Sequence, residues 1–209
     1  MNQRWESLAE RVGKHAGAAE VDLTFALIEA AYAHPRRPYH TLEHVAACLE
    51  MLDGVASMAT SPDAIEFALW LHDVVYIAPR SDNEARSGDA AALIGAILGC
   101  APEFIATART LIDATTHRVP PASGDASLIC DIDMAILGSA PDEYDHYARA
   151  IRLEYSFATD EQYRAGRAAF LERTLRAAPI FVTDHFRSVH EASAIANLRR
   201  ELAMLVAGD

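Results

Sequence analysis

Apolar residues recur every three or four positions along nearly the whole chain, which is the spacing that places side chains on one face of an α-helix. No alternation of apolar and polar residues that would indicate a strand extends beyond a few positions. The pattern predicts helices over residues 8–16, 21–33, 42–54, 62–73, 84–98, 102–116, 126–137, 141–157, 160–177 and 191–206. We therefore expect an all-α protein, and the length of 209 residues suits a single domain over residues 1–209.

Several of these helices have recognisable boundary residues. Thr41 is a capping residue directly before an apolar stretch, and Ser61 precedes Pro62, which favours the first position of a helix. Pro35 ends the helix before it, because proline cannot continue a helix and restricts the residue that precedes it. Ser81 or Asp82 can cap the helix that follows the loop near residue 80.

Two polar residues, His72 and Asp73, stand at the end of an apolar run that begins at Phe67. Both are costly to bury unless each has a partner, and a metal ion is one such partner. Adjacent helical residues point roughly 100° apart. A metal site here therefore needs ligands from other segments.

Three other places have histidine or carboxylate in a helical, largely apolar setting. His40 and His44 share a helix face if their helix begins early enough, His117 follows a predicted helix, and Asp131 and Asp133 interrupt an apolar stretch. Two imidazoles with two carboxylates suit a divalent ion such as Mn, Fe, Co, Ni, Zn or Mg and leave positions for water and substrate. Such an ion lowers the pKa of bound water and polarises a phosphoryl oxygen, which favours hydrolysis.

Composition narrows the class of partner. The net charge of −12 argues against general nucleic-acid binding, but a small phosphorylated substrate needs only a local cluster of arginine and metal. The N-terminus has no apolar signal region and no apolar run is long enough to span a bilayer, so no membrane partner is expected. Cys48, Cys100 and Cys130 form no metal-binding pattern and are interpreted as reduced core thiols. We expect a cytoplasmic protein.

The order H…HD…D on separate helices resembles the HD-domain superfamily of metal-dependent phosphohydrolases. The segments R-x-Y-H-T-L-E-H, W-x-H-D-V-V-Y, S-D-N-E-x-x-S, D-x-D-x-x-I-L-G and I-R-x-E-Y, within residues 37–155, more closely resemble a bacterial subgroup of predicted HD-type phosphohydrolases. The segment Y-H-T-L-E-H is also similar to the Y-H-N-x-x-H of cyclic-nucleotide phosphodiesterases. The resemblance implies an HD-type helical bundle with flanking N- and C-terminal helices.

The resemblance also implies roles for single residues. It implies four metal ligands, which are His44, His72, Asp73 and Asp133. His40 matches the histidine that protonates the leaving group in the cyclic-nucleotide enzymes, and His117 resembles an additional histidine of many members. Glu84 stands where two-metal members often have a histidine, which disfavours a second metal, and Glu84 could orient water instead. Asp131 is interpreted as a helix-start or solvent residue.

Three residues are candidates to bind substrate. Arg37 and Arg152 could hold phosphate, because guanidinium matches phosphate oxygens in a bidentate manner, and Tyr155 could contact substrate. Plainer interpretations stay open. These are an ion pair of Arg152 with Glu154 or Asp145, a core position for Tyr155, a helix cap for His40, and a helix C-terminal charge for His117.

The expected function is metal-dependent hydrolysis of a small phosphate ester, such as a nucleotide or a related metabolite. One alternative is a non-enzymatic, metal-containing protein that binds or senses a ligand, since fold does not fix function. Another is a di-iron HD-type oxygenase, whose additional ligands would come from Glu84 and His117.

Overall fold

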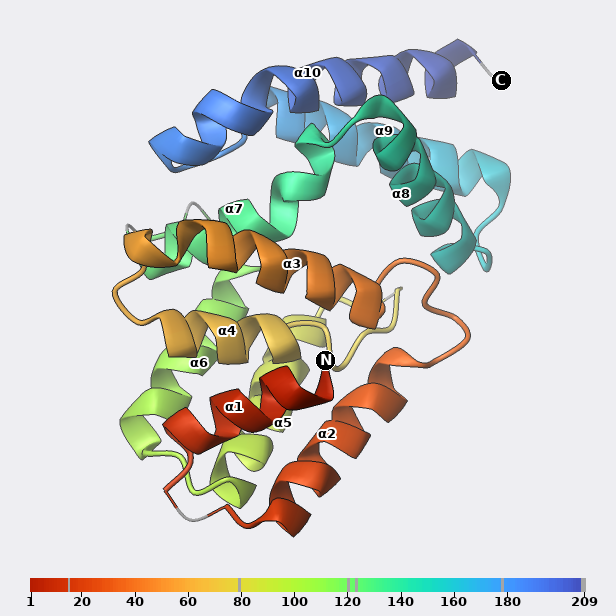
Figure 1. The fold of residues 1–209 in the computed structure, drawn as a ribbon. Helices are drawn as coiled ribbons and strands as arrows, with labels where there is room; N and C mark the ends of the chain where they lie inside the picture. The colour runs from red at the N-terminus through yellow and green to blue at the C-terminus, as the bar shows by residue number, and fades with distance from the viewer. Residues whose placement is uncertain (15, 79, 120, 123, 178, 208–209) are drawn as a thin grey trace. The chain divides into compact units, whose positions relative to one another are not determined.

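The computed structural model describes residues 1–14, 16–78, 80–119, 121–122, 124–177 and 179–207. Within these ranges the chain forms ten α-helices and two short 3₁₀-helices, and the one strand-like pairing is an isolated bridge between Gly13 and Cys100 (Figure 1). The prediction of an all-α fold is confirmed. No helix in the described part of the chain is both long and apolar enough to cross a membrane.

The helices follow one another with short connections. They are α1 (Asn2–Val12), α2 (Ala18–Tyr32), α3 (Leu42–Val55), η1 (Ala56–Met58), α4 (Pro62–Leu71), α5 (Asn83–Ile97), α6 (Pro102–Ala114), α7 (Asp125–Met134), η2 (Ala135–Gly138), α8 (Pro141–Glu154), α9 (Asp160–Arg176) and α10 (Asp184–Ala207). By their internal contacts they divide into two compact units, Met1–Ile129 and Cys130–Asp209. Helix α7 runs without a break from the first unit into the second. A single domain over residues 1–209 stays a prediction.

Helix α4 is the centre of the first unit. All its residues from Ala64 to Leu71 are buried, and α1, α3, α5 and α6 all pack against it. Trp5 of α1 stacks on Phe67 at 5.8 Å between ring centroids and meets Trp70 edge-on at 5.4 Å. A helix that is apolar on all sides is stable only when it is surrounded in this way. Its C-terminal end therefore delivers His72 into a buried environment.

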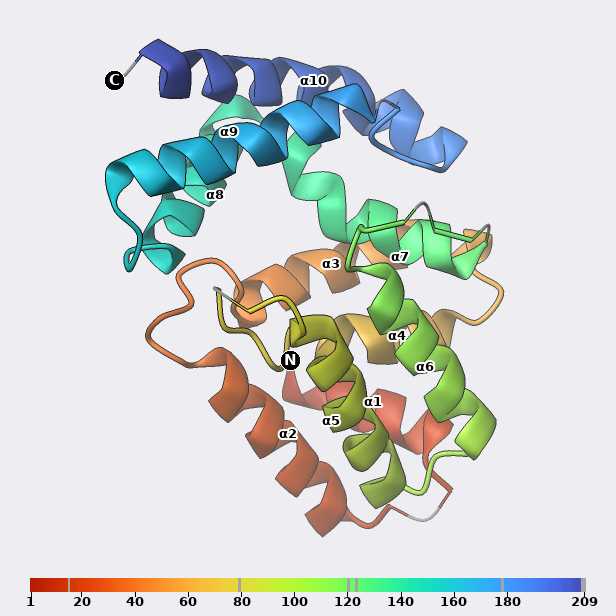
Figure 2. The same cartoon turned by 180° about the vertical axis from the view of Figure 1, so that it is seen from behind.

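Helices α5 and α6 pack side by side in the first unit, as the view from behind shows (Figure 2). Asn83 and Ser87, on the first two turns of α5, are buried polar residues. Buried polar groups need hydrogen-bond partners. Both residues find them in the turn that follows α4.

The second unit contains α8, α9 and α10, with α10 packed on η2 and α9. Its interior includes a buried ion pair in which Arg167 Nε and Nη2 donate to the two carboxylate oxygens of Glu201 at 2.8 and 2.9 Å. Tyr144 donates to the same carboxylate, and Arg167 also donates to the Tyr147 hydroxyl at 3.2 Å. These contacts satisfy a charged pair that would otherwise be costly to bury. They also occupy Arg167 within the protein.

Most helix starts agree with the sequence pattern, but α1 begins at Asn2 rather than at residue 8, and the helix ends differ from the predicted ones. Thr41 accepts a hydrogen bond from the Glu43 N–H at 3.2 Å and caps α3, as predicted. Because α3 begins only at Leu42, His40 lies before the helix and does not share a helical face with His44. Helix α4 ends at Leu71 rather than at residue 73, so the pair His72–Asp73 lies in the turn that follows.

Helix α10 begins at Asp184, seven residues before the predicted start at residue 191. Two histidines and an arginine in its first two turns obscure the apolar spacing there, although Phe186 is buried. The backbone N–H groups of Val182 and Thr183, just before this helix, donate to the carboxylate of Asp131. Such a contact is tertiary and leaves no periodic signal in the sequence.

Candidate metal centre

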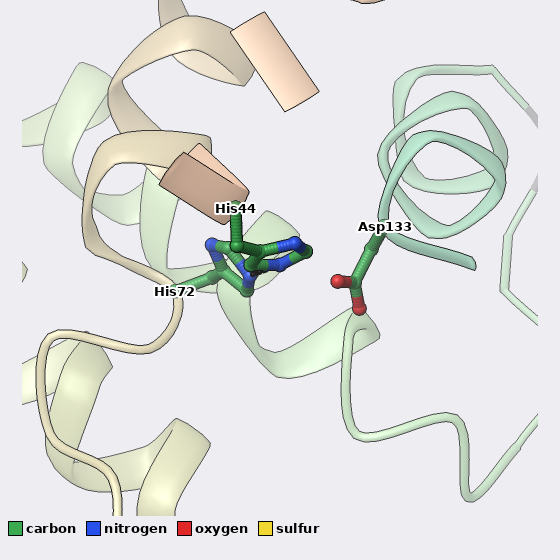
Figure 3. Close-up of side chains that lie close together, drawn as sticks. All are labelled: His44, His72 and Asp133. Carbon is green, nitrogen blue, oxygen red and sulfur yellow. Dashed lines mark hydrogen bonds between the residues drawn. The ribbon is translucent and has the colours of Figure 1, made fainter. Parts of the chain in front are cut away.

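Two histidines and one carboxylate converge in the structure. His44 lies in the first turn of α3, His72 follows the last residue of α4, and Asp133 lies in the last turn of α7. Each offers one ligand atom, and these atoms all lie within 4.8 Å of one another. Figure 3 shows the two imidazole rings together, with the Asp133 carboxylate directed towards them. His44 and His72 are buried and Asp133 is half-buried. This arrangement could hold a metal ion.

The orientation of His72 is set by its own helix. Its Nδ1 lies 2.9 Å from the carbonyl oxygen of Leu69, and a carbonyl can only accept, so Nδ1 carries the proton. In the neutral ring Nε2 then presents its lone pair, and it lies 3.2 Å from Nε2 of His44. Two nitrogens that each lie about 2.1 Å from one ion, at roughly tetrahedral or right angles, are about 3.0–3.4 Å apart. The observed separation fits two ligands of the same ion.

The carboxylate of Asp73 lies close to the same nitrogen. Its Oδ2 is 3.0 Å from His72 Nε2 and 3.9 Å from His40 Nε2, and the residue is buried. A buried carboxylate beside a buried imidazole nitrogen could add an oxygen ligand to this group. Two neutral imidazoles with two carboxylates are suited to a divalent ion. The predicted fourth ligand, Asp73, therefore stands next to the three-residue group.

His40 lies next to this group on a segment without regular structure. Its ring stacks on Tyr76, with centroids 3.9 Å apart and an interplanar angle of 27°. Tyr39, its neighbour in sequence, packs against the ring of His44 at 4.9 Å. Stacking fixes the plane of the His40 ring, and 15% of the His40 side chain is exposed to solvent. A partly exposed imidazole beside such a candidate metal centre is suited to proton transfer.

The other two proposed catalytic residues are placed differently. Glu84 lies in the first turn of α5 and is half-buried, where a negative charge favours the helix. His117 is exposed just beyond α6, with a left-handed backbone φ of 50°. Among the described residues, the group able to hold an ion contains neither of them. Their catalytic roles stay predictions.

The two arginines predicted to bind phosphate both contact protein groups. Arg37 is buried, and its guanidinium donates to the carbonyls of Asp73, Val74 and Tyr76 at 2.9, 3.2 and 3.2 Å. Arg152 donates to the carbonyl of Tyr155 at 3.0 Å, near the end of α8, and to Asp160 at 2.6 Å. Phosphate binding by Arg37 and Arg152 stays a prediction.

The aromatic and acidic neighbours of Arg152 complete this part of the second unit. Tyr155 lies just after α8 and is half-buried, with its ring 5.6 Å from Phe157 and 6.2 Å from Tyr163. Substrate contact by Tyr155 stays a prediction. Asp145, the partner considered for Arg152, pairs instead with Arg200 at 2.7 Å.

The sequence pattern did not reveal the roles of Asn83, Ser87 and Asp131. Asn83 binds the N–H and C=O of Ile77, and Ser87 binds those of Val75, at 3.1–3.2 Å. Asp131 is buried rather than exposed to solvent, because it accepts two backbone N–H bonds at 2.7 Å. The segment S-D-N-E-x-x-S contains Asn83 and Ser87 and was the only available signal for them.

The three cysteines are free and buried, in agreement with the prediction of core thiols. Cys48 lies one turn after His44, with its sulfur 3.8 Å from both ring nitrogens.

Comparisons with protein-family models, with curated proteins and with solved structures found no match for this chain.

Proposed function

We propose that the protein is an HD-type, metal-dependent phosphohydrolase that acts on a small phosphate ester, such as a nucleotide or a related metabolite. The convergence of His44, His72 and Asp133, with their ligand atoms within 4.8 Å, is the observation that carries this proposal. The residues come from three separate helical segments in the order that the HD resemblance implies.

The proposed ligands are His44, His72, Asp73 and Asp133. A divalent ion bound there would lower the pKa of a coordinated water and polarise a phosphoryl oxygen. The carboxylates of Asp73 and Asp133 would balance the charge of the ion, while the Leu69 carbonyl favours the His72 tautomer that could bind metal. The net charge of −12 favours a small substrate over a long nucleic acid, which this surface would repel.

His40 is the proposed proton donor to the leaving oxygen. Its Nε2 lies 3.9 Å from Asp73 Oδ2, and its ring is held flat against Tyr76. This placement leaves the imidazole beside the centre without making it part of the three-residue group. His117 is a second candidate for proton transfer, and its exposed position is less favourable.

The geometry favours this function over the di-iron alternative. An oxygenase of that type requires more ligands, and the two candidates, Glu84 and His117, do not belong to the group found among the described residues. A one-ion centre with open positions is better suited to hydrolysis. A ligand-binding protein without turnover would use the same residues, so an assay must separate these two functions.

The experiment is a turnover assay of the full chain loaded with Mn²⁺, Co²⁺, Ni²⁺ or Mg²⁺ against a panel of phosphate monoesters and diesters. We expect His72→Ala and Asp73→Ala each to lower kcat/KM by more than about 100-fold, because each removes a proposed ligand. His146→Ala and Asp89→Ala are matched controls on exposed faces of α8 and α5. They should remain within about two-fold of the wild type.

Two results would contradict the proposal. Turnover that survives both His72→Ala and Asp73→Ala would show that the reaction does not use this centre. Tight binding of a phosphate ester without any turnover would indicate a ligand-binding protein instead.

A further inference from the structure

The turn after α4 has no regular structure, yet its backbone is bonded almost residue by residue. The Val74 N–H donates to the Leu71 carbonyl at 3.2 Å, which is the last bond of a helical type. Beyond it, residues 73–77 depend on side chains from elsewhere in the first unit. Buried backbone groups without partners are costly, so these side chains determine whether the turn keeps its shape.

Arg37 provides the largest share of these bonds. Its Nη1 donates to the Asp73 carbonyl at 2.9 Å, and its Nη2 donates to the carbonyls of Val74 and Tyr76, both at 3.2 Å. Three of the five guanidinium donors are thereby used on one turn. The guanidinium carbon also lies over two rings, 5.6 Å from the centroid of Tyr32 and 5.7 Å from that of Tyr76. Arg37 is therefore held from several sides.

Asn83 and Ser87 bind the backbone of two further residues of the turn. The Ser87 hydroxyl accepts from the Val75 N–H at 3.1 Å and donates to the Val75 carbonyl at 3.2 Å. The Asn83 amide accepts from the Ile77 N–H and donates to the Ile77 carbonyl, both at 3.1 Å. Each side chain acts as a neighbouring strand would, by pairing with both backbone groups of one residue.

The turn also solves the geometric problem posed by adjacent ligands. In a continued helix His72 and Asp73 would diverge by about 100°. Because α4 ends at Leu71 and the chain turns there, Asp73 Oδ2 comes to 3.0 Å from His72 Nε2. The hydrogen bonds from Arg37 to the carbonyls of Asp73, Val74 and Tyr76 hold this conformation.

The surroundings of Arg37 are unfavourable for an anion. It lines a pocket of about 420 Å³ together with Tyr32, Thr41, Glu29 and Glu43. The two exposed carboxylates in that lining would repel phosphate. The same guanidinium faces neutral carbonyl oxygens on the turn, with which it forms charge-assisted hydrogen bonds.

We propose that Arg37, assisted by Asn83 and Ser87, is a positioning residue that holds the turn carrying Asp73 in its metal-binding conformation. This inference rests on the metal centre of the proposed function but not on the hydrolytic reaction. It replaces direct phosphate contact as the role of Arg37. It also explains why two buried polar residues of α5 face the end of α4.

The test measures Co²⁺ binding to the full chain by titration and follows the visible d–d absorption bands, which report the ligand geometry. Relative to wild type, Arg37→Met should weaken Co²⁺ binding by about 10–100-fold and change the d–d spectrum, as the loss of a residue that orients a ligand does. Arg37→Lys should restore part of the affinity, because one ammonium can still reach a carbonyl. Ser87→Ala should weaken Co²⁺ binding by a smaller factor than Arg37→Met does. Because it removes only one hydroxyl, it provides the test if Arg37→Met does not fold.

Arg4→Met is the matched control. Arg4 is a partly buried arginine of the same unit that donates to Glu66, Asp53 and the Leu49 carbonyl, with no bond to the turn. It should lower the melting temperature and leave Co²⁺ affinity within about two-fold of the wild type. If Arg4→Met weakens Co²⁺ binding as much as Arg37→Met does, the effect is general destabilisation and the proposal is overturned.

The remaining outcomes separate this proposal from the one on which it rests. If Arg37→Met binds Co²⁺ with an unchanged spectrum and has lost affinity for inorganic phosphate, Arg37 is a phosphate ligand and the proposal is wrong. If wild type binds no Co²⁺, the metal centre itself fails and the proposal fails with it. If wild type binds Co²⁺ without hydrolysing any phosphate ester, only the hydrolytic function fails, and the spectra still decide the role of Arg37.

Discussion

Asp131 and Asp133 lie two residues apart on α7, and the structure gives them different surroundings. Asp133 belongs to the group with His44 and His72, whereas both oxygens of Asp131 accept backbone N–H bonds from Val182 and Thr183. The resemblance to HD enzymes favoured Asp133 as the ligand, and the structure brings that residue to the two histidines. One position on the helix is suited to metal binding and the other to holding the start of α10.

Substituting each aspartate by asparagine tests this division. Asp133→Asn should weaken Co²⁺ binding by about ten-fold or more, because the amide removes the negative charge from the donor set. Asp131→Asn should leave Co²⁺ affinity within about two-fold and lower the free energy of unfolding by about 1–3 kcal/mol, since an amide NH₂ cannot accept a backbone N–H. Calorimetric titration and urea unfolding measure the two quantities. Equal loss of metal affinity in both variants would contradict the division.

At the residue scale, the sequence reveals a site residue when that residue conflicts with its neighbours. His72 and Asp73 interrupt an apolar run, so their need for a partner can be read directly. Arg37 gave only a general hypothesis of phosphate binding, because its partners are backbone carbonyls more than thirty-five residues away. Backbone carbonyls belong to every residue and leave no signature in the sequence.

At the scale of the helix, starts were predicted better than ends or exact lengths. Prolines at the first turn of α4, α6 and α8 mark those starts chemically, because proline is tolerated there and lacks an N–H. The end of α4 carries no such mark: apolar residues resume after Asp73 at Val74 and Val75, and tertiary bonds to Arg37 and Ser87 shape the turn. That difference decides whether His72 and Asp73 diverge or meet.

Close packing between η2 and α10 depends on Gly138. A Cβ placed there would lie 2.6 Å from the Cβ of His190 and 2.7 Å from its carbonyl oxygen. Gly138→Ala should therefore force the two helices apart and lower the free energy of unfolding by about 1–3 kcal/mol. Gly166→Ala, in the middle of α9, meets nothing within 4 Å and should raise it by about 0.5–1 kcal/mol through helix propensity.

Urea unfolding followed by circular dichroism compares these two glycine variants within one unit of the protein. The opposite signs are the informative result, because both substitutions add the same methyl group. A stabilised Gly138→Ala variant would mean that η2 and α10 are not in close contact.

At the scale of the whole chain, the division into Met1–Ile129 and Cys130–Asp209 falls inside α7. The apolar spacing is continuous through that helix, and no linker rich in proline, glycine or charge marks a boundary, so the sequence predicted one domain. Units defined by contacts depend on which helices pack together, and periodicity does not encode the choice of packing partner. The cysteines were easier to interpret: the sequence predicted core thiols, and the three cysteines are buried in both units.

Buried acids in both units make the stability of the whole molecule sensitive to alkali. Burial raises the pKa of the Cys100 thiol from 9.0 to about 11 and that of the Tyr163 phenol from 10.0 to about 12. Burial also raises the pKa of Cys130 to about 12, with a further contribution from the charges of Asp133 and Asp131. In each case the folded protein holds a proton that the unfolded chain releases at lower pH.

The sign of the effect follows from this difference in bound protons. Below about pH 9 both states keep these protons, and the contribution to stability is complete. Between about pH 9 and 12 the unfolded chain has lost protons that the folded chain retains, so the free energy of unfolding should fall as pH rises. Urea unfolding under reducing conditions, at intervals from pH 7 to 11.5, measures this slope.

Tyr163→Phe isolates one group, because phenylalanine keeps the ring that packs below Arg152, whose guanidinium carbon lies 4.7 Å from its centroid. Below pH 9 the variant should differ from the wild type by a constant amount. Above pH 10 its free energy of unfolding should fall less steeply with pH, because one buried acid has been removed. The difference between the two slopes should be at most the contribution of one proton. Parallel curves for both proteins up to pH 11.5 would show that the Tyr163 phenol releases its proton equally readily in the folded and unfolded chain.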